Sequence, residues 1–249
     1  MKENVRIVQI RASVFLSENI GFEPSAAEKF KELLMPQGSL CAVMPGAGGQ
    51  VVLTPSNAIP WGATWGIMNE QRSMRIIFLP GKIDFIKDYD CLYDCHLASD
   101  FLLSLVVNSL KSLEDVLKPR NVVWQRIAYA PLMAMIEGEC GDALKCLWNN
   151  IMHVQEQGGG VLEERSVTFL QKKVVNWNDR ATQINLHHNI MDGVRFFKDG
   201  RPEQKATLIQ LDINTVPGMG LFYSMDEIKI FYQQVIPLAE ELVERITNC

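Results

Sequence analysis

The sequence predicts an α+β fold in which strands form a curved antiparallel sheet and the helices pack on one of its faces. Three observations lead to this prediction. Short segments in which apolar and polar residues alternate occur along the whole chain, as expected for half-buried strands. Two longer segments, 97–117 and 224–246, place apolar residues at helical spacing. The order strand, helix, glycine turn, several strands and long helix occurs twice.

The first half of the chain begins with a strand at 5–16, where apolar and polar residues alternate. A helix follows, with Ser25 and Glu28 as a capping box at its start and Pro36 at its end. Turns rich in glycine and proline then separate four expected strands, 50–54, 63–68, 74–79 and 82–86. The long helix 97–117 closes this half, because its leucines recur on one face.

The second half repeats this order of elements. It begins with a strand at 121–136, and a helix follows at 141–154. After a glycine turn, the sequence predicts one or two strands in 162–177 and further strands at 180–192 and 205–215. Ser224 and Glu227 form a second capping box at the start of the closing helix. We expect Pro237 to kink or split that helix near Ile236, because proline cannot donate the helical hydrogen bond.

The repeated order predicts two copies of a β-α-β(3-4)-α unit, in residues 1–120 and 121–249. We expect a pseudo-twofold relation between them and a shared sheet, so that the two halves can form one continuous domain. This layout is similar to the duplicated fold of the TATA-binding protein. In addition, the segment LIQLDIN, Leu208 to Asn214, resembles an LLIDID-like strand in the second half of a scattered, uncharacterised bacterial family. These resemblances imply a fold and no specific chemistry.

Composition and charge narrow the functional classes. The chain has 249 residues and a net charge of −5, so it lacks the basic surplus that duplex-binding proteins show, and we expect no nucleic acid partner. The stretch 39–69 has no acidic or basic side chain, but prolines and glycines interrupt it, which argues against a membrane span. Charged residues interrupt the N-terminal segment, unlike a signal peptide, so we expect a cytoplasmic protein.

The most specific motif is HHNIMDG, from His187 to Gly193. It resembles the His-His-x-x-x-Asp-Gly motif of the chloramphenicol acetyltransferase family and of condensation domains. That resemblance implies that His188 is a general base, that Asp192 has a structural role and holds the loop through an ion pair, and that an acyl-thioester of coenzyme A is the donor. An imidazole with an ordinary pKa suits proton abstraction at neutral pH.

The residues around this motif depart from the family pattern. The family has a long helix after its Asp-Gly, whereas Pro202 prevents a continuous helix here. The second family motif, Asp-Phe-Gly-Trp near the C-terminus, is missing. A strand accounts for the segment better, with four side chains on one apolar face: Ile184, Leu186, His188 and Ile190. His188 is then a partly buried, hydrogen-bonded strand residue.

Tryptophans suggest a candidate binding surface. Trp61 and Trp65 are four residues apart, so a strand would place both rings on one face, and Trp177 has a similar position in the second half. Such rings could stack against a ligand or a partner. The alternative interpretation is that they pack in the core.

The remaining motifs predict no metal and no cofactor. Cys91, Cys95 and His96 could form half of a zinc site, with Cys140 and Cys146 as the other half, but their spacing is wider than in zinc ribbons. The glycine turns lack the Gly-Lys-Ser/Thr ending of a phosphate-binding loop.

The sequence thus favours a cytoplasmic binding or interaction protein without a clear catalytic site. We expect a protein partner or a small ligand that the sequence does not identify, no membrane, and a homodimer as one form of association. The alternative is a coenzyme A-dependent acyltransferase that uses His188.

Overall fold

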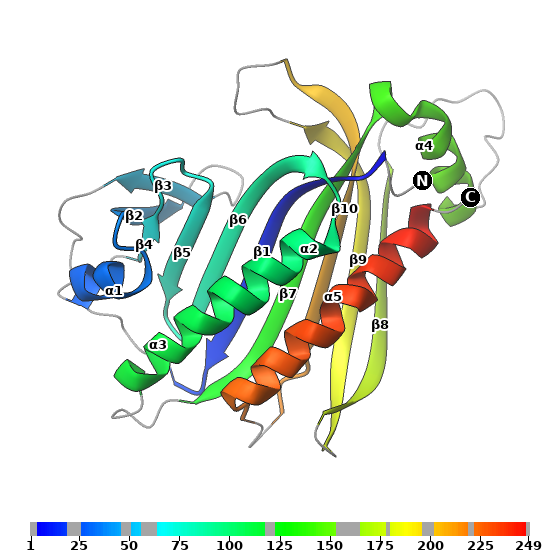
Figure 1. Cartoon of the computed structure of the whole chain (residues 1–249). Helices are drawn as coiled ribbons and strands as arrows, with labels where there is room; N and C mark the ends of the chain where they lie inside the picture. Colours follow the sequence, from blue (N-terminus) through cyan, green and yellow to red (C-terminus); the bar gives the residue numbers. More distant parts are fainter. Residues whose placement is uncertain are drawn as a thin grey trace.

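The computed structural model describes residues 4–18, 26–45, 51–55, 64–117, 123–152, 165–177, 180–195, 202–218 and 222–247. These residues form a mixed α+β structure around one ten-stranded antiparallel sheet (Figure 1). The strands are β1 (Arg6–Leu16), β2 (Ser39–Pro45), β3 (Val51–Pro55), β4 (Trp65–Met68), β5 (Met74–Leu79), β6 (Lys82–Leu92), β7 (Trp124–Ile136), β8 (Ser166–Trp177), β9 (Arg180–Arg195) and β10 (Gln204–Thr215).

The helices follow or connect these strands. They are α1 (Ala27–Leu34), α2 (Cys95–Ser99), the π-helical segment η4 (Asp100–Val106), α3 (Val107–Leu117), α4 (Glu137–Met152) and α5 (Met225–Thr247). Among the residues that the structure describes, no helix is both long and apolar enough to cross a membrane.

The strand order is β3-β2-β4-β5-β6-β1-β7-β10-β9-β8. β1 and β7 therefore lie side by side at the centre, and they pair antiparallel along most of their length. The strands of residues 1–120 form one wing of the sheet, and those of residues 121–249 form the other (Figure 1). Since β1 also pairs with β6, hydrogen bonds run without a break from one wing to the other.

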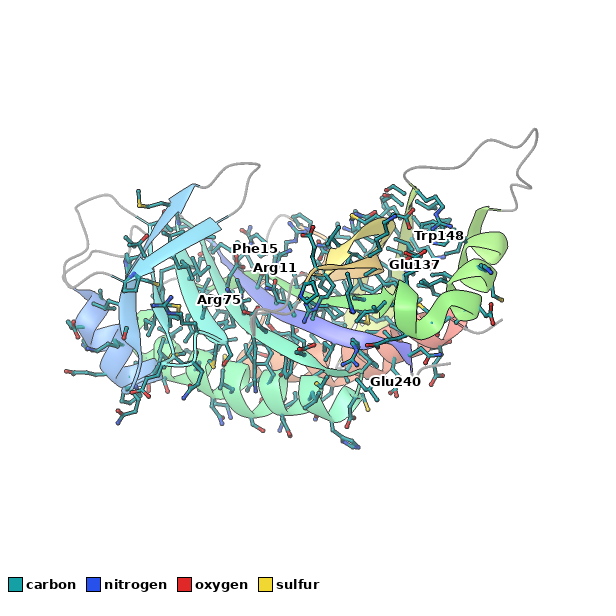
Figure 2. The ribbon with its side chains drawn as sticks, turned by 90° about the horizontal axis from the view of Figure 1, so that it is seen from above. Arg11, Phe15, Arg75, Glu137, Trp148 and Glu240 are labelled. Atoms are coloured by element: carbon teal, nitrogen blue, oxygen red, sulfur yellow. The ribbon has the colours of Figure 1, made fainter. Side chains whose placement is uncertain are left out.

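One face of the sheet carries the core. The α2–η4–α3 segment and α5 run across this face, which we call the helix-covered face (Figures 1 and 2). Alternate residues of the central strands point toward it and are almost fully buried, and apolar side chains of the helices pack against them. Examples are Ile10, Val14, Ile127, Tyr129, Met133, Ile209, Leu211, Phe231 and Tyr232. Burial of this apolar surface is the main source of stability for the layers.

The other face of the sheet, which we call the open face, has no described helix over it (Figure 2). The register places the intervening side chains of β1 there, namely Gln9, Arg11, Ser13 and Phe15. Their cross-strand neighbours on β6 are Asp88, Ile86, Asp84 and Lys82. The open face is thus rich in polar and charged groups at the middle of the sheet.

Several predicted features are confirmed and two need correction. The Ser224–Glu227 capping box is present, since the Glu227 carboxylate accepts the Ser224 N–H at 2.8 Å and Ser224 Oγ accepts the Glu227 N–H at 3.2 Å. The predicted split near Pro237 is wrong, because α5 continues on both sides of the proline. Its buried residues, including Ile236 and Ala239, hold both parts in the core. The predicted helix 97–117 is interrupted by the π-helical turn of η4.

The first predicted capping box is only partly described. Ser25 lies outside the described residues, and the residue before α1, Ala26, makes no side-chain cap. The strand expected at 82–86 is longer than predicted, because β6 continues to Leu92 through its pairing with β1. The β8 segment is one strand, and it lies at the edge of the sheet.

Candidate functional site

The open face holds a buried polar network beside β1. Ser13 Oγ donates to Asp84 Oδ1 at 2.5 Å, and Lys82 Nζ lies 2.9 Å from the same oxygen. Ser13 and Asp84 are only 3% and 6% exposed. The network exists because Ser13 and Asp84 are register partners of adjacent strands. A carboxylate in this position satisfies the hydroxyl and balances the charge of Lys82.

Two cations flank an aromatic ring at the end of this row. Phe15 is the register partner of both Lys82 and Arg126. The Lys82 ammonium lies 5.3 Å from the centre of the Phe15 ring, and the Arg126 guanidinium carbon lies 4.8 Å from it. These distances suit cation–π attraction, which holds both positive groups close to one another despite their like charge.

Arg126 differs from Lys82 in lacking an anionic partner. Among the described residues, no carboxylate forms an ion pair with its guanidinium. Its Nε is buried and has no hydrogen-bond partner in the part of the chain that the structure describes. A buried donor left in this state costs free energy, because it has lost its hydration without gaining a hydrogen bond.

A hollow of about 550 Å³ adjoins these side chains. Its size lies within the range of small-molecule sites. Its lining consists of Phe15, Leu16, Leu79, Pro80, Gly81, Lys82, Gln125, Arg126 and Pro217. Among the described residues this lining includes no carboxylate. Lys82 is paired with Asp84 behind it, whereas Arg126 pairs with no described carboxylate, so the hollow combines an apolar wall with one uncompensated positive charge. We call it the Phe15 hollow.

A second set of charged groups lies farther along β1. Asp88 accepts hydrogen bonds from Gln9 Nε2 at 2.8 Å and from Arg75 at 2.5 Å. Arg11 lies between Gln9 and the Ser13 network, and it forms no ion pair with any described carboxylate. Figure 2 shows Arg11, Phe15 and Arg75 on the side of the sheet away from α3 and α5. Arg11 and Arg126, neither of which pairs with a described carboxylate, thus both lie on the open face.

The HHNIMDG motif lies within β9, as the alternating pattern predicted. His188 is 6% exposed and points to the helix-covered face, between its register partners Leu211 and Phe169. Burial lowers the pKa of His188, and the nearby His187 lowers it further. The expected hydrogen bond of His188 is incomplete, because its Nε2 has no partner. His187 lies on the opposite face, beside Asp212 of β10.

Asp192 forms an ion pair with Arg165, the residue that directly precedes β8. Its carboxylate accepts from Arg165 Nε at 2.8 Å and from the Arg165 backbone N–H at 3.1 Å. The same guanidinium stacks over Trp148 of α4, 4.5 Å from the ring. Trp148 in turn donates to Thr207 of β10 at 3.1 Å. Asp192 therefore helps to connect α4 with β9 and β10, and these contacts do not involve His188.

Trp65 does not belong to the exposed binding surface that we expected. Trp65 is only 1% exposed, and its ring stacks on Phe78 at 4.3 Å and meets Phe30 of α1 at 6.1 Å. Trp65 is thus a core side chain and has no free face for a ligand. Trp61 lies outside the described residues. Trp177 ends β8, where it pairs with Arg180.

The cysteines that we considered as two halves of a zinc site form no common cluster among the described residues. Cys140 is buried at the start of α4, and its Sγ donates to the Ile136 carbonyl at 2.8 Å. Cys91 ends β6, while Cys95 and His96 begin α2. Cys95 and His96 lie close to Asp94, a residue that the sequence analysis did not consider.

Sequence reasoning did not identify the residues of the Phe15 hollow. Phe15 and Arg126 belong to strands that were predicted, but 111 positions separate them in the chain. The available signal was the alternation of β1, which puts Arg11, Ser13 and Phe15 on the face opposite to Ile10, Ala12 and Val14. Charged residues on a face of the central strand indicate that this face is not core.

The comparisons with known proteins show no family. No protein-family model matches the chain, and no curated protein matches it. Among solved structures, the chain has a likeness to the di-domain ARO/CYC StfQ from the steffimycin biosynthetic pathway, at 11% sequence identity, 96% coverage of both chains and a TM-score of 0.20. A TM-score this low does not indicate a shared fold, so this likeness supports no conclusion about the chain.

Proposed function

We propose that the protein is a binding protein that takes a small anionic ligand on its open face, with Arg126 as the main contact. The observation that carries this proposal is the guanidinium of Arg126, which lines a hollow of about 550 Å³ with a buried Nε that has no partner. Lys82 lines the same hollow as a further donor, although its charge is balanced by Asp84. Arginine presents a planar fork of donors that matches a carboxylate or a phosphate group.

The apolar side of the hollow suggests the rest of the ligand. Phe15, Leu16, Leu79 and two prolines supply apolar surface next to the cations. A ligand that carries one anionic group on a small hydrocarbon or aromatic body would satisfy both parts of the lining. Because no described residue of the lining is a carboxylate, the lining does not repel such an anionic group, and Arg126 can balance its charge.

The duplicated layout is part of this proposal. The central pair β1 and β7, each followed by a helix and by a wing that ends in a long helix, supports two related units in 1–120 and 121–249. In that layout the central strands supply both sides of the ligand site, since Phe15 belongs to β1 and Arg126 to β7. A protein partner or a homodimer would use surfaces other than this hollow.

The acyltransferase alternative gains no support from the geometry. A general base must reach the proton that it abstracts, directly or through one water molecule. His188 is 6% exposed on the helix-covered face, so its imidazole is not open to a substrate. The open-face imidazole is that of His187, whose register partner is Asp212.

Thermal denaturation with defined anions tests the proposal. We expect inorganic phosphate or benzoate, each added at constant ionic strength, to raise the melting temperature of the native protein, because a ligand that binds only the folded state stabilises it. The Arg126→Met variant keeps the stem of the side chain over Phe15 and removes the charge. It should lose most of the shift. Whichever anion gives the larger shift distinguishes a phosphate ligand from a carboxylate ligand.

A matched control removes a positive charge elsewhere. Lys111 is exposed on α3, so Lys111→Met should keep the full shift. Equal shifts in the native protein, Arg126→Met and Lys111→Met would mean that the anions act on the whole surface, and the proposal would be wrong. Native mass spectrometry of the protein from its own cells would then identify the molecule that the site retains.

A further inference from the structure

We propose that Asp94, Cys95 and His96 form a site for a divalent transition-metal ion, with Zn²⁺ as the best fit. One ligand atom from each of these residues lies within 4.8 Å of the others. The cluster follows β6 at the end opposite to Lys82, so the length of that strand, about 33 Å, separates it from the Phe15 hollow. This site is therefore independent of the proposed anion site.

The local backbone brings the three side chains together. Asp94 is extended, with φ −140° and ψ 124°, and it is the N-cap of α2. Its Oδ1 accepts the backbone N–H of His96 at 2.8 Å, which fixes the orientation of the carboxylate. Cys95 and His96 occupy the first turn, so their side chains leave the helix next to the cap. A hydrogen bond to a metal-binding carboxylate is the usual way in which proteins hold such a ligand in place.

The donor set points to zinc among the common metals. A thiolate, an imidazole and a carboxylate are the three ligand types that Zn²⁺ takes in proteins, at about 2.0 to 2.3 Å. In a tetrahedral site the ligand atoms are then about 3.3 to 3.8 Å apart. The ligand atoms now lie up to 4.8 Å apart, so metal binding requires them to approach by about 1 Å. Asp94 and His96 are exposed, and Cys95 is half-buried, so their side chains can turn without displacing the core.

The surroundings leave access to a fourth ligand. A hollow of about 570 Å³ is lined by Cys91, Asp94 and Cys95, and a second hollow of about 310 Å³ is lined by Cys95 and His96. Glu240 of α5 lines both hollows. Figure 2 shows Glu240 on the helix side of the sheet. A metal ion beside Cys95 would thus face α5, with room for water or for the Glu240 carboxylate to complete a tetrahedron.

Binding has a defined proton balance. The Cys95 thiol must lose its proton to the solvent to become a thiolate ligand, and the imidazole binds in its neutral form. Metal binding therefore releases protons and should be weaker at low pH. No electron is transferred, because Zn²⁺ has no redox chemistry in proteins.

Titration with Co²⁺ tests the site directly, because cobalt reports thiolate coordination by its absorption spectrum. We expect the full chain, purified in the presence of a reductant and freed of metal, to bind one Co²⁺ with a near-ultraviolet band from the Cys95 thiolate. Zn²⁺ should displace the cobalt and abolish the band. The Cys95→Ser variant should lose the band, and His96→Gln should weaken Co²⁺ binding about tenfold or more.

Two control variants keep the test specific. Cys91 is the nearest other thiol in the chain, and Cys91→Ser should keep the cobalt band. His187 lies on β9, and His187→Gln should bind Co²⁺ as the native protein does. Circular dichroism of each variant shows whether it is folded. A band that persists in Cys95→Ser, or the absence of one-to-one cobalt binding by the folded native protein, would overturn the assignment.

Discussion

Trp65 shows how a single side chain can be misassigned when its neighbours are unknown. Its ring is 1% exposed and packs between the rings of Phe30 and Phe78. We predict that Trp65→Ala lowers the free energy of unfolding by about 3 to 5 kcal/mol, because it leaves a cavity among rings that cannot close over it. Urea denaturation measures this loss. Trp65→Phe should cost less, and Leu33→Ala on the exposed face of α1 should cost under about 1 kcal/mol. A similar small effect of Trp65→Ala would contradict its place in the core.

His188 should make the stability of the protein depend on pH. Its pKa is lowered from 6.5 in the folded protein by burial and by His187, so the unfolded chain binds a proton more readily. The stabilising contribution of the neutral imidazole is therefore present above pH 6.5 and is lost as the pH falls through the lowered pKa.

The pH dependence can be assigned by substitution. We expect the free energy of unfolding of the native protein to decrease from about pH 7.5 to about pH 5, and His188→Leu to flatten this part of the curve. Urea denaturation at a series of pH values measures it. His187→Gln should leave most of the slope in place, because burial is the larger cause of the shift. An unchanged slope in His188→Leu would show that another group is responsible.

At the scale of the element, the start of α5 depends on its capping box. Ser224 Oγ accepts the Glu227 N–H, and the Glu227 carboxylate accepts the Ser224 N–H. We predict that Ser224→Ala costs about 1 kcal/mol of stability, because the Glu227 N–H at the helix end loses its acceptor, the Ser224 hydroxyl. Chemical denaturation measures the change. Ser112→Ala, in the interior of α3, should be nearly neutral, since its hydroxyl only donates back to the Asn108 carbonyl. Equal effects of both variants would rule out a special role for the cap.

The edge strand β8 is the element most exposed to other chains. It has twelve residues and one unpaired edge, and Phe169, Leu170 and Val174 are 43%, 55% and 62% exposed. A long edge strand with exposed apolar side chains tends to pair with another strand. We predict that the native protein associates as its concentration rises, and that Leu170→Lys reduces this association. Sedimentation velocity over a concentration series measures it. Leu33→Lys, on α1, should leave the association unchanged. If Leu33→Lys reduced the association and Leu170→Lys did not, the contact would lie on α1 and the prediction would be wrong.

At the scale of the whole molecule, the two halves of the chain share one sheet and one core. β1 pairs with β6 on one side and with β7 on the other, and the buried apolar cluster includes residues of both halves. We predict that the full chain unfolds in a single calorimetric transition, with equal calorimetric and van't Hoff enthalpies. Two resolved transitions would show that 1–120 and 121–249 are separate folding units, as would a calorimetric enthalpy well above the van't Hoff value.

Patterns among neighbouring residues were sufficient to predict most elements and their buried faces. The alternation along β9 placed Ile184, Leu186, His188 and Ile190 on one face, and the structure buries all four. Such patterns are readable because the period of a strand or a helix involves only neighbouring residues. The same holds for the Ser224–Glu227 box, whose members are three positions apart.

Contacts between elements that are distant in the chain could not be predicted from such patterns. The pairing of β1 with β7 brings Phe15 beside Arg126, and the packing of α1 on the sheet buries Trp65. Contacts of this kind depend on strand order and register, which are set by the total burial of apolar surface and not by any local pattern. The Asp94 cluster is local in sequence, yet its three side chains converge only because the chain changes there from strand to helix.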